Sequence, residues 1–415
     1  MNCSRPSNGE KNLDIEFLRA VAIAMTLFQH VEVLFYWRDS LYWEIRRHVD
    51  FWTGVDLFFC VSGFVITRSL MLSYPTAAGN DDHLISTGLG WKRTAGAFWI
   101  KRAWRLWPAA WLWAVVSILC ATFLNRSGIF GEPAKMAWDA LAAIVHVANF
   151  HWAGCYQGAL HRCNFVEASQ ITTLLPTGWN LVIYWSLSLE EQFYLLAPLL
   201  LLACRRRHLA LVIALLLLLQ APLARPPLGV LWFFRTDAIL LGVGLAWAAQ
   251  SGFGQLTARR IASARHGLRV AALLLVAALA WLAAAPRAGQ PGAVFVIALA
   301  CAGLVWIAGH DRCVLIAGGP ARAALIWLGA RSYSLYLTHL VAFFVTREIW
   351  FRLGGVDGAL QVAMYLATAA VLLVAGSELS YTLVESRLRR RGRRYAARWL
   401  SGTGQTAPLT RQEPP

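Results

Sequence analysis

Charged residues are scarce in this chain, at 14% of its 415 residues. A soluble domain averages about 25%, so the composition excludes an ordinary soluble protein. Hydrophobic residues reach 58%. They form long runs, such as those at 209–223 and 270–285, that are typical of membrane helices. We therefore expect an all-α membrane protein, a polytopic bundle of about ten transmembrane helices.

Acidic residues are fewer than basic ones, with 22 Asp and Glu against 38 Lys and Arg, which gives a net charge of +16. Such a charge can indicate nucleic-acid binding, but its placement argues otherwise. The basic residues cluster between apolar segments, as in cytoplasmic loops under the positive-inside rule, and no nucleic-acid partner is expected. The clusters are Lys92, Arg93, Lys101, Arg102 and Arg105; Arg205 to Arg207; Arg259, Arg260 and Arg265; and Arg387 to Arg394.

A signal-peptide cleavage site is missing. The first apolar stretch carries Glu16, Arg19 and His30, and no small-residue site follows it, so we interpret it as a retained first span. The basic clusters then predict a multi-pass protein of the inner (plasma) membrane with both termini cytoplasmic. Residues 1–12 form the N-terminal segment, and 391–415 a basic, then disordered tail. The spans lie near 14–36, 52–72, 104–124, 181–203, 209–223, 228–249, 268–285, 292–309, 323–346 and 360–384.

A standard zinc-ligand spacing is also missing. Cys155 and Cys163 lie in the predicted external segment 125–180. There we expect a disulfide rather than a metal site with His151 and His161. The apolar stretch at 137–152 is too short and too polar for a span, which favours a re-entrant or interfacial helix. Three further cysteines lie within spans and are interpreted as packing residues, namely Cys60, Cys120 and Cys301.

Several spans contain ionisable or polar residues that a passive helix does not need. Arg19 and His30 are eleven positions apart, which places them on one helical face, about 16 Å apart along the axis. Ionisable side chains in hydrocarbon are costly and mark functional sites. The other polar positions are Asp56 and Ser62; Glu190, Glu191 and Tyr194; Arg235 and Asp237; and Ser332, Tyr333, Tyr336 and His339.

These positions fall in motifs that occur in the order IEFLRAVAI followed by His30, GVDLFFCVSGFVIT, KRAWRLWP, WSLSLEEQFYLL and LGARSYSLYLTHL. The ordered set resembles the acyltransferase-3 family of integral-membrane O-acyltransferases, which modify bacterial surface carbohydrates. The resemblance runs from about Leu13 to Arg390 and predicts an acyltransferase transmembrane domain at 13–390. One departure is Glu16, where an Asp is commoner in the family; the charge is kept.

The resemblance implies an acyl-CoA donor, usually acetyl-CoA, on the cytoplasmic side, and no metal. It implies a sugar hydroxyl as acceptor, often lipid-linked or already exported. Lipopolysaccharide, exopolysaccharide, peptidoglycan and a small metabolite all remain open as acceptors. The route of transfer is also open. It is either direct transfer, which we favour, or transfer through a covalent intermediate on Ser62 or a cysteine.

His30 is the candidate general base, because imidazole titrates close to neutral pH and can take the proton of a sugar hydroxyl. The alternative is a buried histidine satisfied by its neighbours. Arg19, Arg102 and Arg105 are the candidate ligands of the CoA phosphates. The alternative for them is that basic residues belong on the cytoplasmic side in any case.

Glu190 is the second candidate catalytic residue, expected to meet His30 in an outward-facing cavity, where it orients the imidazole or binds the acceptor. The alternative is an internal ion pair with Arg235. Glu191 points about 100° away on the helix and is the weaker candidate. The candidate substrate-binding residues are Asp56, Ser62, Tyr194, Arg235, Asp237, Tyr333 and His339. The alternative for Asp56 is that it holds Arg235 or His30.

Two rival functions follow from the same polar residues. A transporter or flippase for a glycan also carries polar groups at mid-membrane, but no matching halves occur in the sequence. A non-catalytic scaffold leaves Arg19, His30 and Glu190 unexplained.

Overall fold

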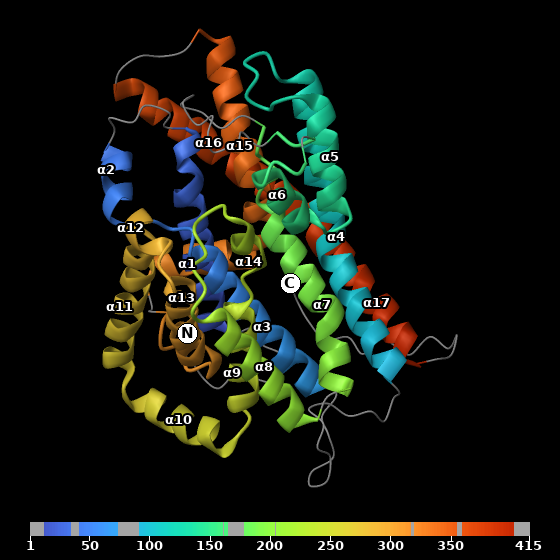
Figure 1. Ribbon diagram of the computed structural model, residues 1–415, viewed down its shortest axis with the longest axis vertical. Helices are drawn as coiled ribbons and strands as arrows, with labels where there is room; N and C mark the ends of the chain where they lie inside the picture. The colour runs from blue at the N-terminus through green and yellow to red at the C-terminus, as the bar shows by residue number, and fades with distance from the viewer. Residues whose placement is uncertain are drawn as a thin grey trace.

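The computed structural model describes residues 12–34, 41–73, 91–160, 162–164, 178–203, 205–316, 319–354 and 359–401. Over these residues the chain is helical and contains no β-strand, which confirms the all-α prediction (Figure 1). The elements are α1 Leu13–His30, η1 Val31–Val33, α2 Leu41–His48, α3 Gly54–Ser73, α4 Trp91–Phe123, α5 Pro133–Ile144, α6 Ala148–Tyr156, α7 Tyr184–Ala203, α8 Arg206–Gln220, η3 Val230–Phe234, α9 Asp237–Ala248, α10 Gly252–Ser263, α11 Arg265–Ala283, α12 Ala285–Ala288, α13 Ala293–Gly309, α14 Ala321–Ala330, α15 Ser332–Arg352, α16 Ala359–Leu379, the π-helix η4 Ser380–Glu385 and α17 Ser386–Ser401.

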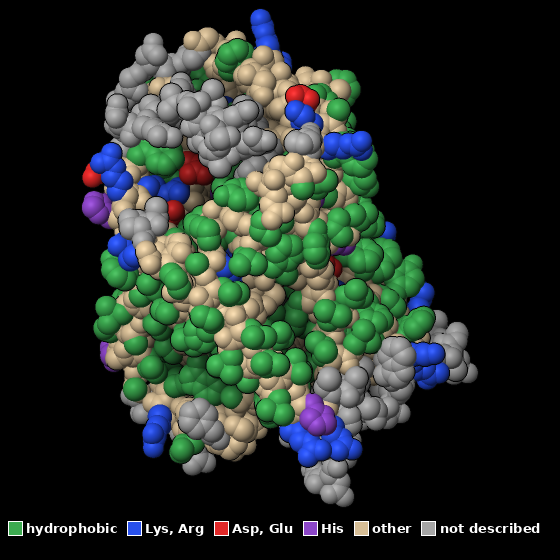
Figure 2. Space-filling view, in the orientation of Figure 1, with side chains coloured by type: hydrophobic (Ala, Val, Ile, Leu, Met, Phe, Trp, Pro, Cys, Tyr) green, Lys and Arg blue, Asp and Glu red, His purple; other side chains and the backbone are tan. Residues whose placement is uncertain are grey.

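Five of the described helical stretches are long and apolar enough to cross a membrane. They are Gly54–Leu72, Lys92–Phe123, Val230–Ala248, Arg265–Ala283 and Leu360–Ser401. Figure 2 shows hydrophobic side chains over the middle of one face, with Lys and Arg gathered toward its two ends. The protein is therefore a helical, multi-pass membrane protein. Helices also lie at the other predicted spans, but the count of ten and the orientation of the termini stay predictions.

Helix α3 lies at the centre of the bundle and packs closely on α9. Two glycines allow this approach, one on each helix. A Cβ at Gly63 would lie 2.2 Å from Ile239 O, and a Cβ at Gly242 would lie 2.3 Å from Cys60 O. Small residues at helix crossings have this role in membrane bundles, where close backbone contact replaces the hydrophobic driving force. Cys60 and Cys301 are buried and free, in keeping with a packing role, and Cys120 is free and half-buried.

Two predicted boundaries differ from the structure. The ninth span was expected as one helix at 323–346, but the chain turns at Arg331 and divides into α14 and α15. Helix α14 instead packs against α1, where a Cβ at Gly329 would lie 2.1 Å from Glu16 O. Helix α4 begins at Trp91, so Lys101 and Arg102 lie within a helix and not in a loop.

The basic C-terminal stretch is also helical. Helix α17 runs beside α4 (Figure 1). Trp104 and Tyr395 stack with their ring centroids 5.2 Å apart. The basic stretch 387–394 thus forms part of a packed helix, whereas the disorder expected after residue 401 lies outside the described residues.

The described part of the segment 125–180 contains two short helices and no long one. Helices α5 and α6 are separated at His146, whose φ is +59°, so 137–152 is not one continuous span. Cys155 and Cys163 form a disulfide, which confirms the predicted pairing. His151 Nε2 lies 2.7 Å from Asp139 Oδ1 beside it. Burial raises the pKa of Asp139, and the hydrogen bonds from His151 and Asn164 offset part of that rise.

Candidate active site

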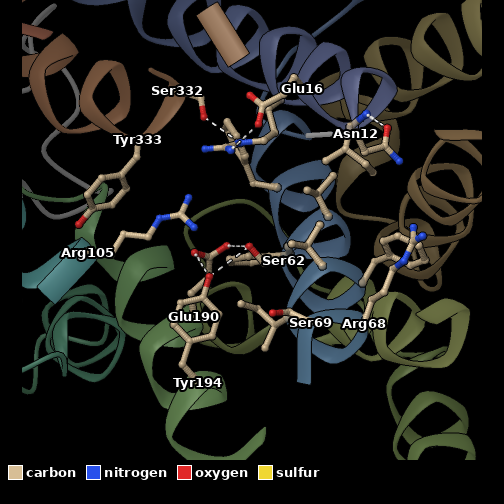
Figure 3. A pocket seen from close by; sticks show the side chains of 18 of the residues that line it. Asn12, Glu16, Ser62, Arg68, Ser69, Arg105, Glu190, Tyr194, Ser332 and Tyr333 are labelled. Atoms are coloured by element: carbon tan, nitrogen blue, oxygen red, sulfur yellow. Dashed lines mark hydrogen bonds and ion pairs between the residues drawn. The ribbon is translucent and has the colours of Figure 1, made fainter. Parts of the chain in front are cut away.

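A cavity of about 770 Å³ is lined by residues of α1, α3, α4, α7 and α15, including Asn12, Glu16 and Arg19 at or near the start of α1 (Figure 3). Its volume is in the range of small-molecule and cofactor sites. Six arginines line it against three acidic residues, and these are Arg19, Arg68, Arg102, Arg105, Arg312 and Arg389 against Glu16, Glu190 and Asp311. An excess of guanidinium groups around a concave site suits an anionic ligand.

The cavity brings together the three arginines that the sequence suggested as phosphate ligands. Arg102 and Arg105 are three apart on α4, so they share a face. Arg105 points into the cavity, and its Nε is buried without a hydrogen-bond partner among the described residues. Arg19 donates from Nε to Ser332 Oγ over 3.2 Å and pairs with Glu16 over 3.3 Å. Arg19 is thus held in place, whereas Arg105 keeps donors available for a ligand.

A second polar group in the cavity consists of Ser62, Glu190 and Tyr194. Ser62 Oγ donates to Glu190 Oε1 over 2.8 Å. Tyr194 OH lies 3.1 Å from Glu190 Oε2 and 3.2 Å from Ser62 Oγ (Figure 3). Glu191, one position along α7, instead accepts from Trp107 Nε1 outside the cavity.

This placement corrects the expectation that Glu190 meets His30. Among the described residues, the hydrogen-bond partners of Glu190 are Ser62 and Tyr194, and the cavity lining does not include His30. The ion pair expected as the alternative is wrong as well, because Arg235 pairs with Asp56.

His30 lies at the last position of α1, eleven residues after Arg19 on the same helix. His30 Nδ1 is 3.1 Å from Nε2 of His339, which comes from α15. The same Nδ1 is 2.9 Å from Thr26 O. His339 is fully buried, and its own Nδ1 is 2.7 Å from Tyr336 O. Two residues that the sequence assigned to different roles are therefore in direct contact.

Tyr336 connects the cavity to the histidine pair. Its side chain lines the cavity together with Phe58 and Ser186, and its ring lies 5.7 Å from that of His339. The Tyr336 hydroxyl is 2.6 Å from Ser186 Oγ and 3.1 Å from Ile183 O. The cavity lining therefore adjoins the histidine pair at Tyr336.

Two buried ion pairs account for three of the expected substrate-binding residues. Arg235 donates to both carboxylate oxygens of Asp56, at 2.9 and 3.2 Å, and its guanidinium lies 3.7 Å from the centre of the Trp232 ring. Asp237 is bound by Arg225. Neither Asp56, Arg235 nor Asp237 lines the cavity. Their contacts favour a structural role, in which they hold α3 and α9 in place.

Tyr333 lines the cavity, but its hydroxyl donates to Leu106 O over 2.7 Å.

Sequence reasoning missed Arg68, Arg312 and Arg389. Arg68 was detectable, because it is a charged residue six positions after Ser62 in an apolar helix and such a residue suggests a site. Arg312 and Arg389 were hidden among the basic residues that topology alone explains.

Comparison with known proteins identifies the family of this chain. The acyltransferase domain family matches residues 12–379. The putative peptidoglycan O-acetyltransferase YrhL of Bacillus subtilis is 25% identical over 92% of this chain and 56% of its own length. The peptidoglycan O-acetyltransferase OatA of Listeria monocytogenes is 26% identical over 91% of this chain and 56% of its own length.

The chain thus spans about half the length of these relatives. No solved structure matches it. Since the family match covers nearly the whole of the described bundle, including Arg19, His30, Glu190 and His339, the chain belongs to the acyltransferase-3 family of membrane proteins.

Proposed function

We propose that this protein is a membrane-bound O-acetyltransferase that moves an acetyl group from acetyl-CoA to a hydroxyl of a cell-envelope carbohydrate. The observation that carries the proposal is the arginine-lined cavity, whose inner end at Tyr336 adjoins the buried contact between His30 and His339. A site for an anionic donor and a candidate base therefore lie next to each other, as acyl transfer requires.

The donor occupies the cavity from the cytoplasmic side. Arg102 and Arg105 bind its phosphates, since guanidinium groups match phosphate oxygens in a bidentate geometry. Arg19, held by Ser332 and Glu16, contributes positive charge farther in. The thin pantetheine arm then extends past Ser62 and Tyr336 toward His30.

The transfer is direct. His30 takes the proton of the acceptor hydroxyl, and the oxygen attacks the thioester carbonyl. The tetrahedral intermediate collapses with cleavage of the C–S bond, and the CoA sulfur leaves and is protonated. The acceptor approaches from the external side, where α1 ends at His30. The names of the relatives favour a peptidoglycan-type glycan among the carbohydrate acceptors.

The test uses the purified full-length chain in lipid nanodiscs with radiolabelled acetyl-CoA and soluble peptidoglycan fragments. We expect label on the glycan from the wild type and none from His30→Ala, with CoA binding retained. Label transfer at the normal rate by His30→Ala would remove His30 as the base. Failure of the wild type to transfer or hydrolyse acetyl-CoA, together with uptake of labelled glycan into proteoliposomes, would favour a transporter.

A further inference from the structure

The contact between His30 and His339 joins two helices whose residues are 309 positions apart in the chain. The ring centroids are 4.9 Å apart and the ring planes are tilted by 49°, so the rings meet through their nitrogens rather than by stacking. The His339 side chain is completely enclosed. Buried polar atoms must be paired, so the question is which nitrogen carries which proton.

The hydrogen-bond network assigns both protons. His339 Nδ1 faces the Tyr336 carbonyl at 2.7 Å, and a carbonyl can only accept, so this nitrogen carries the hydrogen. A neutral imidazole has one N–H, which leaves His339 Nε2 as an acceptor. That acceptor lies 3.1 Å from His30 Nδ1.

His30 Nδ1 meets a second acceptor, the Thr26 carbonyl at 2.9 Å. Two acceptors converge on one nitrogen, so His30 also carries its hydrogen on Nδ1. The opposite assignment would place the lone pair of Nδ1 against that of the carbonyl oxygen. The remaining nitrogen, His30 Nε2, therefore holds the free lone pair that a general base needs.

We propose that His339 is a positioning residue, which accepts the hydrogen bond from His30 Nδ1–H and so presents His30 Nε2 as the proton acceptor in acyl transfer. This inference rests on the proposed function. As His30 becomes positively charged in the transition state, the lone pair of His339 Nε2 faces the growing charge. A base oriented by a third group is the general arrangement of activated nucleophile sites, with a neutral imidazole here in the orienting place.

The Thr26 carbonyl cannot replace His339. It belongs to the same helix as His30, four residues before it, and it moves with the ring it would orient. His339 belongs to α15, so it fixes the ring relative to the part of the bundle that lines the cavity. Loss of His339 should therefore lower the rate of transfer and leave donor binding unchanged.

The test compares His339→Leu, His339→Gln and Thr346→Val in the full-length protein. The Gln side chain can place its amide oxygen near the position of Nε2, whereas Leu offers no acceptor. Thr346 is a fully buried residue two turns along the same helix, bonded to Ala342 O, and serves as the packing control. We expect His339→Leu to misorient His30 and lower kcat by up to about 100-fold, the low end of what a general base contributes. His339→Gln should stay within about tenfold of the wild type, and the KM for acetyl-CoA should be unchanged.

Two results would overturn the inference. One is a kcat for His339→Leu equal to that of Thr346→Val, and the other is a His339→Gln variant that folds but is as slow as His339→Leu. If the Leu variant does not fold, ¹⁵N imidazole shifts of the wild type decide: protonated Nδ1 on His30 is expected, and protonated Nε2 refutes it. An inactive wild type removes the proposed function together with this inference, whereas an active wild type with an unaffected Leu variant removes only the role of His339.

Discussion

Replacing Arg105 by Gln should weaken donor binding without harming the fold. Arg105 lies on the cavity wall, and its Nε is buried without a hydrogen-bond partner among the described residues. Arg19 and Arg389 repel its charge, and Glu385 attracts it. Burying this guanidinium costs desolvation free energy, and few contacts in the donor-free protein offset that cost. Removing the charge should therefore leave the free energy of unfolding unchanged or raise it.

The effect on donor affinity has the opposite sign. A hydrogen bond to a charged group contributes roughly 1.5–3 kcal/mol. Each 1.4 kcal/mol is a factor of about ten in Kd, so loss of one Arg105–phosphate contact should raise the Kd for CoA by roughly 10- to 150-fold. Gln retains part of the hydrogen bonding, which favours the lower end of this range.

Calorimetric titration of CoA into the nanodisc-embedded protein measures the Kd, and a thermal melt without ligand measures stability. Arg93→Gln is the matched control, because Arg93 is exposed on the same helix and does not line the cavity. The reasoning is refuted if Arg105→Gln binds CoA as the control does, or if its melting temperature without ligand falls well below that of the control.

Three further outcomes are expected. Ser62→Ala should still transfer acetyl groups, with a loss of less than about tenfold for one hydrogen bond to Glu190; acetyl–Ser62 detected by mass spectrometry would contradict direct transfer. Asp56→Asn should lower stability by roughly 3–5 kcal/mol, because Arg235 is left buried without its charge partner, and an unchanged melt would argue against a structural role. Cys155→Ser should lower the melting temperature by removing the link to Cys163, with Cys120→Ser as the control; a disulfide-linked peptide from the wild type in non-reducing digests is the direct check.

The features that sequence predicts well here depend on a single helix. Arg19 and His30 lie on α1, and Arg102 and Arg105 on α4, so helical periodicity and the cost of burying charge were enough to select them. The Cys155–Cys163 disulfide was predictable for a different reason, because both cysteines lie in the segment expected outside the membrane, where oxidising conditions permit a disulfide.

The sequence could not predict how far one helix is shifted along its axis relative to a neighbouring helix. Glu190 was expected beside His30, but the register of α7 places it beside Ser62 of α3, in the cavity with Arg19. The His30–His339 contact depends on the docking of α1 on α15. Periodicity within either helix contains no information about that docking.

The C-terminal helix α17 contributes to the cavity although it lies beyond the region that the family match covers. The family match ends at residue 379, yet α17 begins after it and supplies Arg389 to the cavity. A chain cut at the end of the match would lose Arg389 from the lining of the proposed donor site and expose the apolar side of α4, including Trp104. Tags and fusions are thus safer after residue 401, where α17 ends.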